Sequence, residues 1–365
     1  MKILFYLGHP AHYHLFKNIL KRLMIKNHNV KVLVKKKDVL EDLLENDGID
    51  YMNILSEVRS NSKWGMGWAM LKKDWRIFKI CLTFKPDLMV GTPPELGHIG
   101  TLMKIPTIHV NEDDQHIYNF ASKYLTYPWA DYILSPTSCD NGKWNYKSIK
   151  YNGYHELAYL HPNHFSASKK IVHLYFPTNE PYFIIRFAKL TAHHDEGIQG
   201  ISNKLAQKII AILNSKGNVF ITSERELPSE LESYRMAINP LDIHHVLAFA
   251  SLYIGDSQTM AAESAVLGTP FVRFNDFVGR IGYLQELEQK YKLGFGIKTN
   301  EPEKLLDTIQ NLADTEDLKQ NFIAHRNKML NDKIDVSKLF TWMIENFPDS
   351  LSILENNPEY QKKFV

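Results

Sequence analysis

Residues 251–274, SLYIGDSQTMAAESAVLGTPFVRF, form the stretch around which the rest of the chain is organised. Its two ends, residues 251–254 and 271–274, are short apolar runs typical of buried strands. The segment between them begins with residues that favour a helix N-cap and ends in Gly-Thr-Pro, which stops a helix. The pattern therefore predicts a strand, a polar turn, a helix and a second strand, as in an α/β domain.

The start of this predicted helix is a candidate anion site. Free backbone N–H groups and the positive end of the helix dipole converge there, and Ser257, Gln258 and Thr259 add polar groups. Glu263 follows Thr259 by about one turn, so we expect its carboxylate to project from the same face toward a wet cleft. A diphosphate at the helix start and a ribose held by Glu263 fit this spacing. An ordinary capped helix is the alternative.

The overall composition is that of a globular protein with two domains. The chain has 365 residues, 44% of them hydrophobic and 23% charged, and two domains of roughly 150–200 residues suit this length. A formal net charge of +2 gives no case for a nucleic-acid partner. Cys81 and Cys139 lack disulfide or metal spacing, and no apolar run approaches a membrane span. We therefore expect a cytoplasmic protein without a signal peptide.

Strands and helices alternate along both halves of the chain, which predicts two parallel sheets with crossover helices. The predicted strands cover residues 3–7, 28–34, 51–54, 87–90, 106–110, 131–134, 182–187, 218–222, 251–254 and 271–274. The predicted helices cover residues 15–24, 39–46, 201–214, 243–250, 284–291, 302–313 and 336–347. The Gly- and Pro-containing stretch 151–181 reads as the crossing between domains. We expect domains at 1–165 and 166–335, followed by a helical segment at 336–365.

Polar residues follow several predicted strands, where active sites of parallel sheets lie. The predicted loop 8–14 holds His9, His12 and His14. Glu95 and the cluster Glu112 to Asp114 follow two further strands. The acidic cluster has no closed set of metal ligands, so we expect no metal and read it as a solvated loop or an acidic helix start.

Two α/β domains across a cleft, with the nucleotide site in the second, constitute the glycosyltransferase-B (GT-B) architecture. The motif Gly255-Asp256-Ser257-x-Thr259-x-x-x-Glu263-x-x-x-x-Gly268-x-Pro270 resembles the nucleotide-sugar site of two enzymes. They are the peptidoglycan N-acetylglucosaminyl transferase and the non-hydrolysing UDP-N-acetylglucosamine 2-epimerase. The stretches GHPAHYHLFK, RFAKLTAHHDEG and NPLDIHHVLAFASLYIGDSQT are similar to an uncharacterised bacterial and archaeal family of glycosyltransferase-like proteins.

This resemblance implies roles for residues of the second domain. Glu263 would bind the ribose hydroxyls, and Ser257, Gln258 and Thr259 would donate to phosphate. The guanidinium of Arg186 suits a diphosphate, although an inter-strand salt bridge is the alternative. The stretch His193-His194-Asp195 would close over the phosphates or the donor sugar, or is a plain polar loop. Ile243 and His244 stand where the resembled enzymes bind the base through backbone groups. The C-terminal helix would return to brace the first domain.

Sugar transfer with inversion needs a base for the acceptor hydroxyl and positive charge for the departing diphosphate. For the base we favour His14 or His12, with Glu95 and Asp113 behind them. The helix start at 257–259 and Arg186 would neutralise the diphosphate without a metal or cofactor.

Residues 64–82 carry an apolar stripe at helical spacing: Trp64, Trp68, Leu71, Trp75, Phe78 and Leu82. Six cations flank it and one acid opposes them: Arg59, Lys63, Lys72, Lys73, Arg76 and Lys79 against Asp74. Contact with an anionic membrane surface or a lipid-linked acceptor is one interpretation. The other is a core helix whose stripe packs on the sheet.

Three functions are compatible with these patterns. The first is transfer of a sugar from a nucleotide-diphosphate sugar, which we expect to be UDP-linked, to a cell-surface polysaccharide or a lipid-linked acceptor. It would take place in the cytoplasm or at the inner face of the cytoplasmic membrane. The second is a nucleotide-sugar 2-epimerase, disfavoured because no full carboxylate set accompanies Glu95 and Asp113. The third is a non-catalytic nucleotide-sugar-binding partner.

Overall fold

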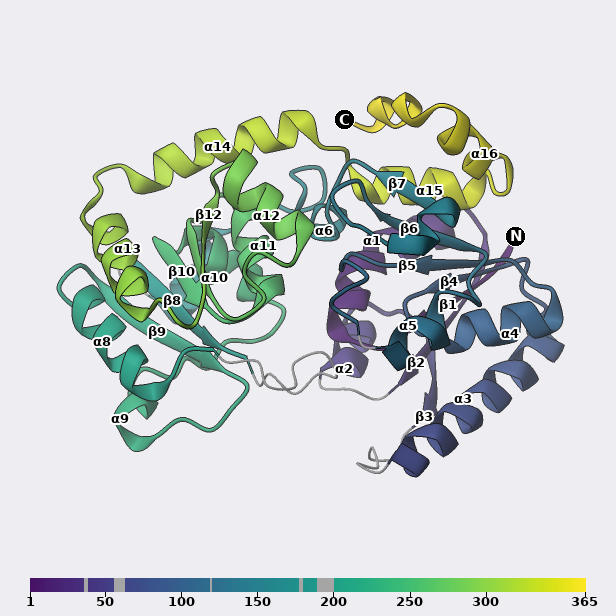
Figure 1. Ribbon diagram of the computed structural model, residues 1–365, viewed down its shortest axis with the longest axis horizontal. Helices are drawn as coiled ribbons and strands as arrows, with labels where there is room; N and C mark the ends of the chain where they lie inside the picture. Colours follow the sequence, from purple (N-terminus) through teal and green to yellow (C-terminus); the bar gives the residue numbers. More distant parts are fainter. Residues whose placement is uncertain (36–38, 56–62, 119, 177–179, 189–199) are drawn as a thin grey trace. The chain divides into compact units, whose positions relative to one another are not determined.

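The computed structural model describes residues 1–35, 39–55, 63–118, 120–176, 180–188 and 200–365 (Figure 1). The chain divides into two compact units. Unit 1 consists of Met1–Tyr159 and Ile334–Val365, and unit 2 of Leu160–Lys333. Each unit is built around one sheet, so the expected pair of α/β domains with parallel sheets is confirmed.

Unit 1 contains a seven-stranded sheet in the order β3-β2-β1-β4-β5-β6-β7, with every neighbouring pair parallel. Its strands are β1 Lys2–Leu7, β2 Asn29–Lys35, β3 Tyr51–Leu55, β4 Leu88–Gly91, β5 Thr107–Val110, β6 Tyr132–Pro136 and β7 Ser148–Tyr151. Its longer helices are α1 Pro10–Ile25, α2 Leu40–Asn46, α3 Lys63–Phe84, α4 Glu95–Met103, α5 Phe120–Thr126, α15 Val336–Glu345 and α16 Asp349–Asn356. Short helical turns occupy Gly142–Lys147 (η1) and Pro358–Phe364 (η3), and a third, Leu157–Leu160 (α6), ends on the first residue of unit 2.

Helix α1 begins earlier than the sequence predicted. We expected a loop over residues 8–14, but the helix starts at Pro10, so His12 and His14 stand in its first two turns. Proline suits a first helical position because it has no N–H to satisfy and its φ is already helical. The ring of His9 caps this end by accepting a hydrogen bond from the N–H of Ala11 at 3.1 Å.

Helix α3 does not pack on the sheet through the stripe that the sequence showed, so that interpretation is wrong. Ile77, Cys81 and Phe84 are buried instead, in a core that includes Leu4 and Met89 from β1 and β4. The opposite side of the helix is exposed to solvent.

Unit 2 contains a five-stranded parallel sheet in the order β12-β11-β10-β8-β9. Its strands are β8 Tyr182–Phe187, β9 Asn218–Ser223, β10 Leu252–Gly255, β11 Phe271–Phe274 and β12 Gly294–Ile297. Its helices are α7 Lys169–Tyr175, α8 Asn203–Leu213, α9 Ser229–Glu232, α10 Ile243–Phe249, α11 Gln258–Leu267, α12 Gly282–Gln285, the π-helical turn η2 Glu286–Lys290, α13 Pro302–Asp314 and α14 Leu318–Asp332.

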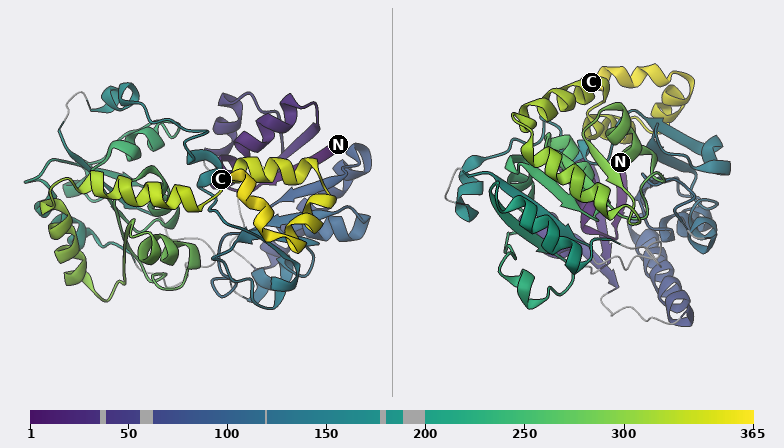
Figure 2. Two further views of the ribbon diagram at one scale, coloured as in Figure 1. Left: turned by 90° about the horizontal axis from the view of Figure 1, so that it is seen from above. Right: turned by 60° about the vertical axis from the view of Figure 1, so that its left-hand side comes forward.

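The C-terminal segment completes unit 1 after the chain has passed through unit 2 (Figure 2). The ring of Phe340 on α15 lies 5.0 Å from that of Tyr151 on β7, and Ser337 donates a hydrogen bond to the carbonyl of Ala158 at 2.8 Å. The backbone N–H of Ile334 donates to the carbonyl of Asn152 at 3.1 Å. The points where the chain leaves and re-enters unit 1 are therefore adjacent.

Candidate functional site

In unit 2 the polar groups gather at the carboxyl edge of the sheet, where β10 turns into α11. Ser257 is the N-cap of α11, and its hydroxyl accepts a hydrogen bond from the N–H of Met260 at 3.4 Å. Ser257 and Gln258 are half-buried and Thr259 is exposed. The helix ends at Gly268, whose φ of +78° suits a residue without a side chain. The predicted strand, turn and helix are therefore present, with the N–H groups of the helix start at the sheet edge.

Glu263 lies inside this helix and not in a wet cleft, so that expectation is wrong. Its exposure is 5%, and its Oε1 lies 2.9 Å from Nε2 of His244 on α10. Every residue from Met260 to Leu267 is buried, because α11 is covered on all sides. His244 is itself 4% exposed. Its hydrogen bond to Glu263 fixes where the carboxylate points and compensates its burial.

Arg186 stands on β8 in register with Gly255 of β10 and Thr222 of β9. Its guanidinium pairs with Glu224, just after β9, and its side chain is 19% exposed. The predicted alternative, a salt bridge between neighbouring strands, is therefore present in this structure. The Glu224 side chain is 52% exposed, so water screens this pair and its contribution to stability is small.

Asp256 joins three strand ends at this edge. Its Oδ1 accepts a hydrogen bond from the N–H of Ala188 after β8 at 2.6 Å, and its carbonyl accepts one from Nδ2 of Asn275 after β11 at 2.9 Å. Burial raises the pKa of the Asp256 carboxyl to about 6, against the lowering effect of the Ala188 N–H and the charge of Arg225. The sequence motif contained Asp256, but its role as a link between strands was not predicted.

Two further parts of the donor site were predicted, and the structure describes only one of them. Ile243 and His244 begin α10, as predicted, and Asp242 precedes them at the N-cap. The stretch His193-His194-Asp195 lies outside the described residues.

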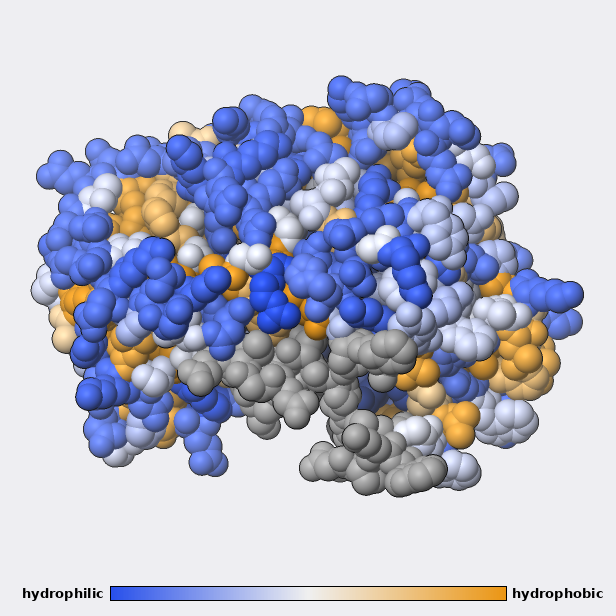
Figure 3. All heavy atoms as spheres, viewed as in Figure 1, coloured by the Kyte–Doolittle hydropathy of each residue, from blue (hydrophilic) through white to orange (hydrophobic). Residues whose placement is uncertain are grey.

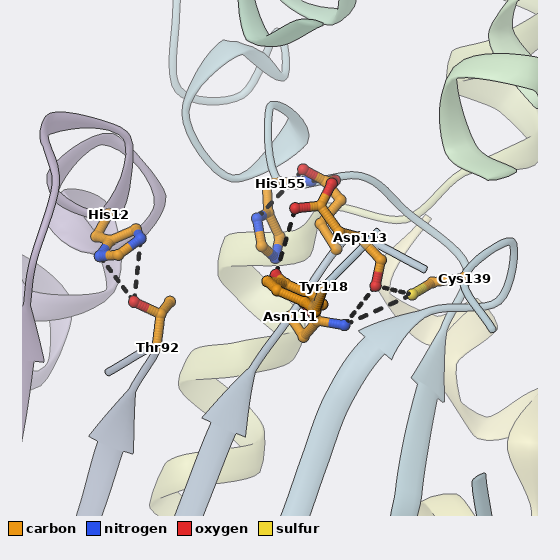
Figure 4. A network of polar contacts seen from close by, with 8 residues as sticks. His12, Thr92, Asn111, Asp113, Tyr118, Cys139 and His155 are labelled. Carbon is orange, nitrogen blue, oxygen red and sulfur yellow. Dashed lines mark hydrogen bonds and ion pairs between the residues drawn. The ribbon is translucent and has the colours of Figure 1, made fainter. Parts of the chain in front are cut away.

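In unit 1 the predicted histidines lie at the start of α1, beyond the end of β1. His12 accepts a hydrogen bond at Nδ1 from the N–H of Gly8 at 3.0 Å. The hydroxyl of Thr92, just after β4, lies 2.8 Å from the same nitrogen (Figure 4). His14 packs against the rings of Tyr13 and Tyr159, with centroids 5.1 and 5.2 Å away. His12 is therefore joined to the strand ends, whereas His14 is packed among aromatic rings.

The two predicted carboxylates behind these histidines are engaged elsewhere. Glu95 is 1% exposed and forms an ion pair with Lys73 of α3, on the side of the sheet that α3 and α4 cover. Asp113 accepts a hydrogen bond from the hydroxyl of Tyr118 at 3.3 Å. Its backbone carbonyl accepts from Nδ2 of Asn111 at 2.7 Å and from the thiol of Cys139 at 3.1 Å (Figure 4). The structure does not bring Glu95 and Asp113 together with His12.

A buried cluster of two carboxylates and a histidine lies at this edge: Glu112, Glu156 and His155. None of the three was predicted as a site residue. Glu112, after β5, accepts the backbone N–H of His155 at 2.7 Å, and its other oxygen lies 3.3 Å from the His155 ring. Glu156 is buried beside this pair. Burial, and then the charge of Glu156, raise the pKa of Glu112 well above its ordinary value. Burial lowers the pKa of His155 to about 3, so this ring is neutral at physiological pH.

A signal for this cluster was present in the sequence but incomplete. The acidic run after β5 pointed to the region, yet nothing in it distinguished Glu112 from Asp113. Glu156 and His155 belong to the stretch that we read as a domain crossing, so no pattern joined them to residue 112.

Comparison with known proteins supports the fold. A family model described as "Protein of unknown function (DUF354)" matches residues 1–279. No curated protein matches the sequence. Among solved structures, S. aureus MnaA with UDP has a TM-score of 0.68 at 12% identity and covers 96% of this chain and 98% of its own.

UDP-GlcNAc 2-epimerases and glycosyltransferases both occur among the similar structures. The UDP-GlcNAc 2-epimerase of Methanocaldococcus jannaschii, in complex with UDP-GlcNAc and UDP, has a TM-score of 0.63 at 14% identity, covering 90% of this chain and 100% of its own. The spinosyn rhamnosyltransferase SpnG with spinosyn aglycone has a TM-score of 0.59 at 12% identity, covering 95% and 100%. The GT-B fold is thereby confirmed. Proteins that share a fold can carry out different reactions.

Proposed function

The chain belongs to the DUF354 family of proteins of unknown function, and we propose that it is a metal-independent glycosyltransferase that uses a nucleotide-diphosphate sugar. The donor is a UDP sugar, and the acceptor is a cell-surface polysaccharide or a lipid-linked glycan. The observation that carries the proposal is the carboxyl edge of the unit 2 sheet. There the N–H groups at the start of α11 lie one turn from the oriented carboxylate of Glu263.

Separate groups at this edge would bind the diphosphate and the nucleoside of the donor. The helix start at Ser257, Gln258 and Thr259 supplies N–H and hydroxyl donors for the diphosphate, and Arg186 on the neighbouring strand supplies a cation. Glu263 accepts hydrogen bonds from the ribose hydroxyls, and Ile243 and His244 line the position of the base. As the bond to the sugar breaks, the same helix dipole and guanidinium stabilise the charge that develops on the leaving diphosphate.

For the acceptor side we propose His12 as the base that removes the hydroxyl proton. Imidazole exchanges protons near neutral pH, and the contacts of His12 with Gly8 and Thr92 hold its ring at the carboxyl edge of the unit 1 sheet. His14 is the less suitable of the two predicted histidines because aromatic rings enclose it. Glu95 and Asp113 are less suitable still, because each is engaged by another side chain.

A nucleotide-sugar 2-epimerase is the second candidate, favoured by one observation. The Glu112 carboxyl, whose pKa is raised, lies against the neutral ring of His155 and beside Glu156 at the unit 1 edge. Proton removal and return on one sugar requires groups of this kind.

Nucleotide binding and product analysis separate these functions. UDP or a UDP sugar at 100 times its dissociation constant should stabilise the fold by about 2.7 kcal/mol, measured as a rise in melting temperature. We expect UDP release that depends on an acceptor, and His12→Gln should lower its rate by about 100-fold or more while UDP still binds. His173→Gln, an exposed histidine on α7, is the control.

Three results would contradict the transferase. If no nucleotide diphosphate raises the melting temperature, the donor site is wrong. If the sugar changes without an acceptor, and Glu112→Gln abolishes the change, the protein is an epimerase. If nucleotide sugars bind and neither reaction occurs with any acceptor class, the protein is a binding partner.

A further inference from the structure

Helix α3 carries large apolar side chains on its solvent side. Trp68 is 63% exposed, Trp75 57%, Leu71 57% and Leu82 51%. Their spacing places them on one side of the helix, opposite the buried Ile77 and Cys81. Because an apolar side chain of this size is usually buried, four on one helix side indicate a surface that something else covers.

Cations lie along the same exposed side. Lys72, Arg76 and Lys79 follow one another at helical spacing beside the tryptophans. The ammonium of Lys79 lies 5.1 Å from the centre of the Trp75 ring, and Trp75 stacks on Phe78 at 5.7 Å. We refer to these apolar and basic residues, of which all but the half-buried Lys72 are exposed, together as the α3 face: Trp68, Leu71, Lys72, Trp75, Arg76, Lys79 and Leu82.

Two acidic side chains of α3 and α4 are engaged by partners outside the α3 face. Asp74 is the one acidic residue in the sequence of α3, and its carboxylate lies 3.2 Å from His98 of α4. Glu95 of α4 is buried against Lys73. The α3 face therefore presents positive charge to the solvent without a carboxylate of its own helix among it.

The neighbouring helix α4 also carries an exposed apolar side chain. α4 packs beside α3, and its Leu102 is 67% exposed. In Figure 3 orange and pale side chains appear together over the region that α3 and α4 occupy in Figure 1. Trp129, 42% exposed, lies 5.4 Å from the His98 ring and adds an indole near α4.

We propose that the α3 face docks this protein on a membrane surface that contains anionic lipids. Indole rings partition to the boundary between headgroups and acyl chains, and lysine and arginine beside them attract anionic headgroups. Arg76 and Lys79 are exposed beside the indoles, so their positive charge favours an anionic surface over a neutral apolar one. Within the described part of the chain no helix has the length and apolar character to cross a bilayer, so α3 would lie on the surface.

The biological role of this docking, which is to bring the enzyme to a lipid-linked acceptor, rests on the proposed function. Binding to lipid itself requires neither donor nor acceptor. A failure of membrane binding and a failure of sugar transfer can therefore be measured separately.

Sedimentation of the full chain with lipid vesicles tests the proposal. We expect binding to phosphatidylcholine vesicles that contain 30% phosphatidylglycerol, at least ten-fold weaker binding to pure phosphatidylcholine, and loss of binding as salt rises from 0.1 to 0.5 M. The double variant Trp68→Ser with Trp75→Ser should bind at least ten-fold more weakly than wild type. Lys72→Glu with Lys79→Glu should lose the preference for anionic lipid.

Matched controls come from exposed residues elsewhere in the chain. Tyr146→Ser with Leu174→Ser changes two side chains that are 79% and 77% exposed, and Lys204→Glu with Lys208→Glu changes two lysines on α8. Both controls should bind anionic vesicles as wild type does, and every variant should keep the wild-type melting temperature and its response to UDP.

Two results would overturn the proposal. One is equal vesicle binding by wild type and the tryptophan variant, or no binding to anionic vesicles at all. The other is a dimer in the absence of lipid that the tryptophan substitutions dissociate, which would assign the α3 face to a second copy of the chain.

Discussion

The Glu263 carboxylate has two hydrogen-bonding partners: His244 in the protein itself and a ribose in the proposed complex. Its spacing from Ser257 and Thr259 was readable in the sequence, because both lie on one helix. The burial of Glu263 could not be predicted, because its partner His244 stands on α10. The packing of α10 against α11 leaves no local pattern in the sequence. The same reason explains why Glu112 and His155 were missed as a pair, since they follow different strands.

Substitution of Glu263 should therefore affect both binding and folding. Glu263→Gln keeps the shape and an acceptor for His244, so it should lower UDP affinity by about 1.5–3 kcal/mol with a small change in stability. Glu263→Ala leaves Nε2 of His244 buried without this acceptor and should also lower the free energy of unfolding by about 1–3 kcal/mol. Isothermal titration with UDP and urea unfolding of both variants provide the two measurements. Wild-type UDP affinity in a folded Glu263→Gln variant would remove Glu263 from the donor site.

Among the elements, the ends of β8, β10 and β11 depend on one another through Asp256. Short apolar runs predicted these strands because four to six such residues between turn signals suit a buried strand and are too few for a typical helix. Two elements were not predicted from the sequence. They are β7, whose residues Ser148–Tyr151 alternate in character, and α14, which has few buried residues. The start of α1 was misplaced because proline and histidines were read as loop residues, although proline suits a helix start.

Asp256 should make the stability of the protein depend on pH. A free carboxyl has a pKa near 3.8 and the folded carboxyl one of about 6, so between these values the folded state holds a proton that the unfolded state has lost. The free energy of unfolding should therefore fall as pH rises from about 4 to 6, by at most about 3 kcal/mol from this group. Asp256→Asn should remove that fall. In urea titrations, the free energy of unfolding of the variant minus that of wild type should therefore increase from pH 4 to pH 7.

Asp307→Asn, an exposed residue on α13, serves as the control and should follow the wild-type pH profile. Parallel profiles for Asp256→Asn and wild type would show that the Asp256 carboxyl is not held against ionisation in the folded protein.

At the scale of the whole molecule, unit 1 is assembled from two separate parts of the sequence. The alternation of strands and helices was enough to predict two parallel sheets, because each crossover covers a sheet that must be buried. The exact boundary was not readable, since Tyr159 and Leu160 are both buried and belong to the same short helix, α6.

Removal of residues 334–365 should unfold unit 1 and spare unit 2. Five apolar residues of α15 are buried, and each contributes about 1.5–3 kcal/mol: Val336, Leu339, Phe340, Met343 and Ile344. The loss of about 8–15 kcal/mol matches the whole stability of a typical domain. Near-ultraviolet circular dichroism and limited proteolysis of the truncated chain should show a protected fragment within 160–333 and rapid cleavage within 1–159. Equal protection of both regions would contradict this assignment.

The return of α15 to unit 1 also sets the order in which the two cores can be completed on the ribosome. Residues 1–159 are translated first, yet their sheet gains its last covering helix only after all of unit 2 has emerged. At roughly 5–20 residues per second, the apolar side of α1 that α15 covers stays open for many seconds. Nascent chains paused before residue 334 would therefore be the form of this protein that chaperones recognise most strongly.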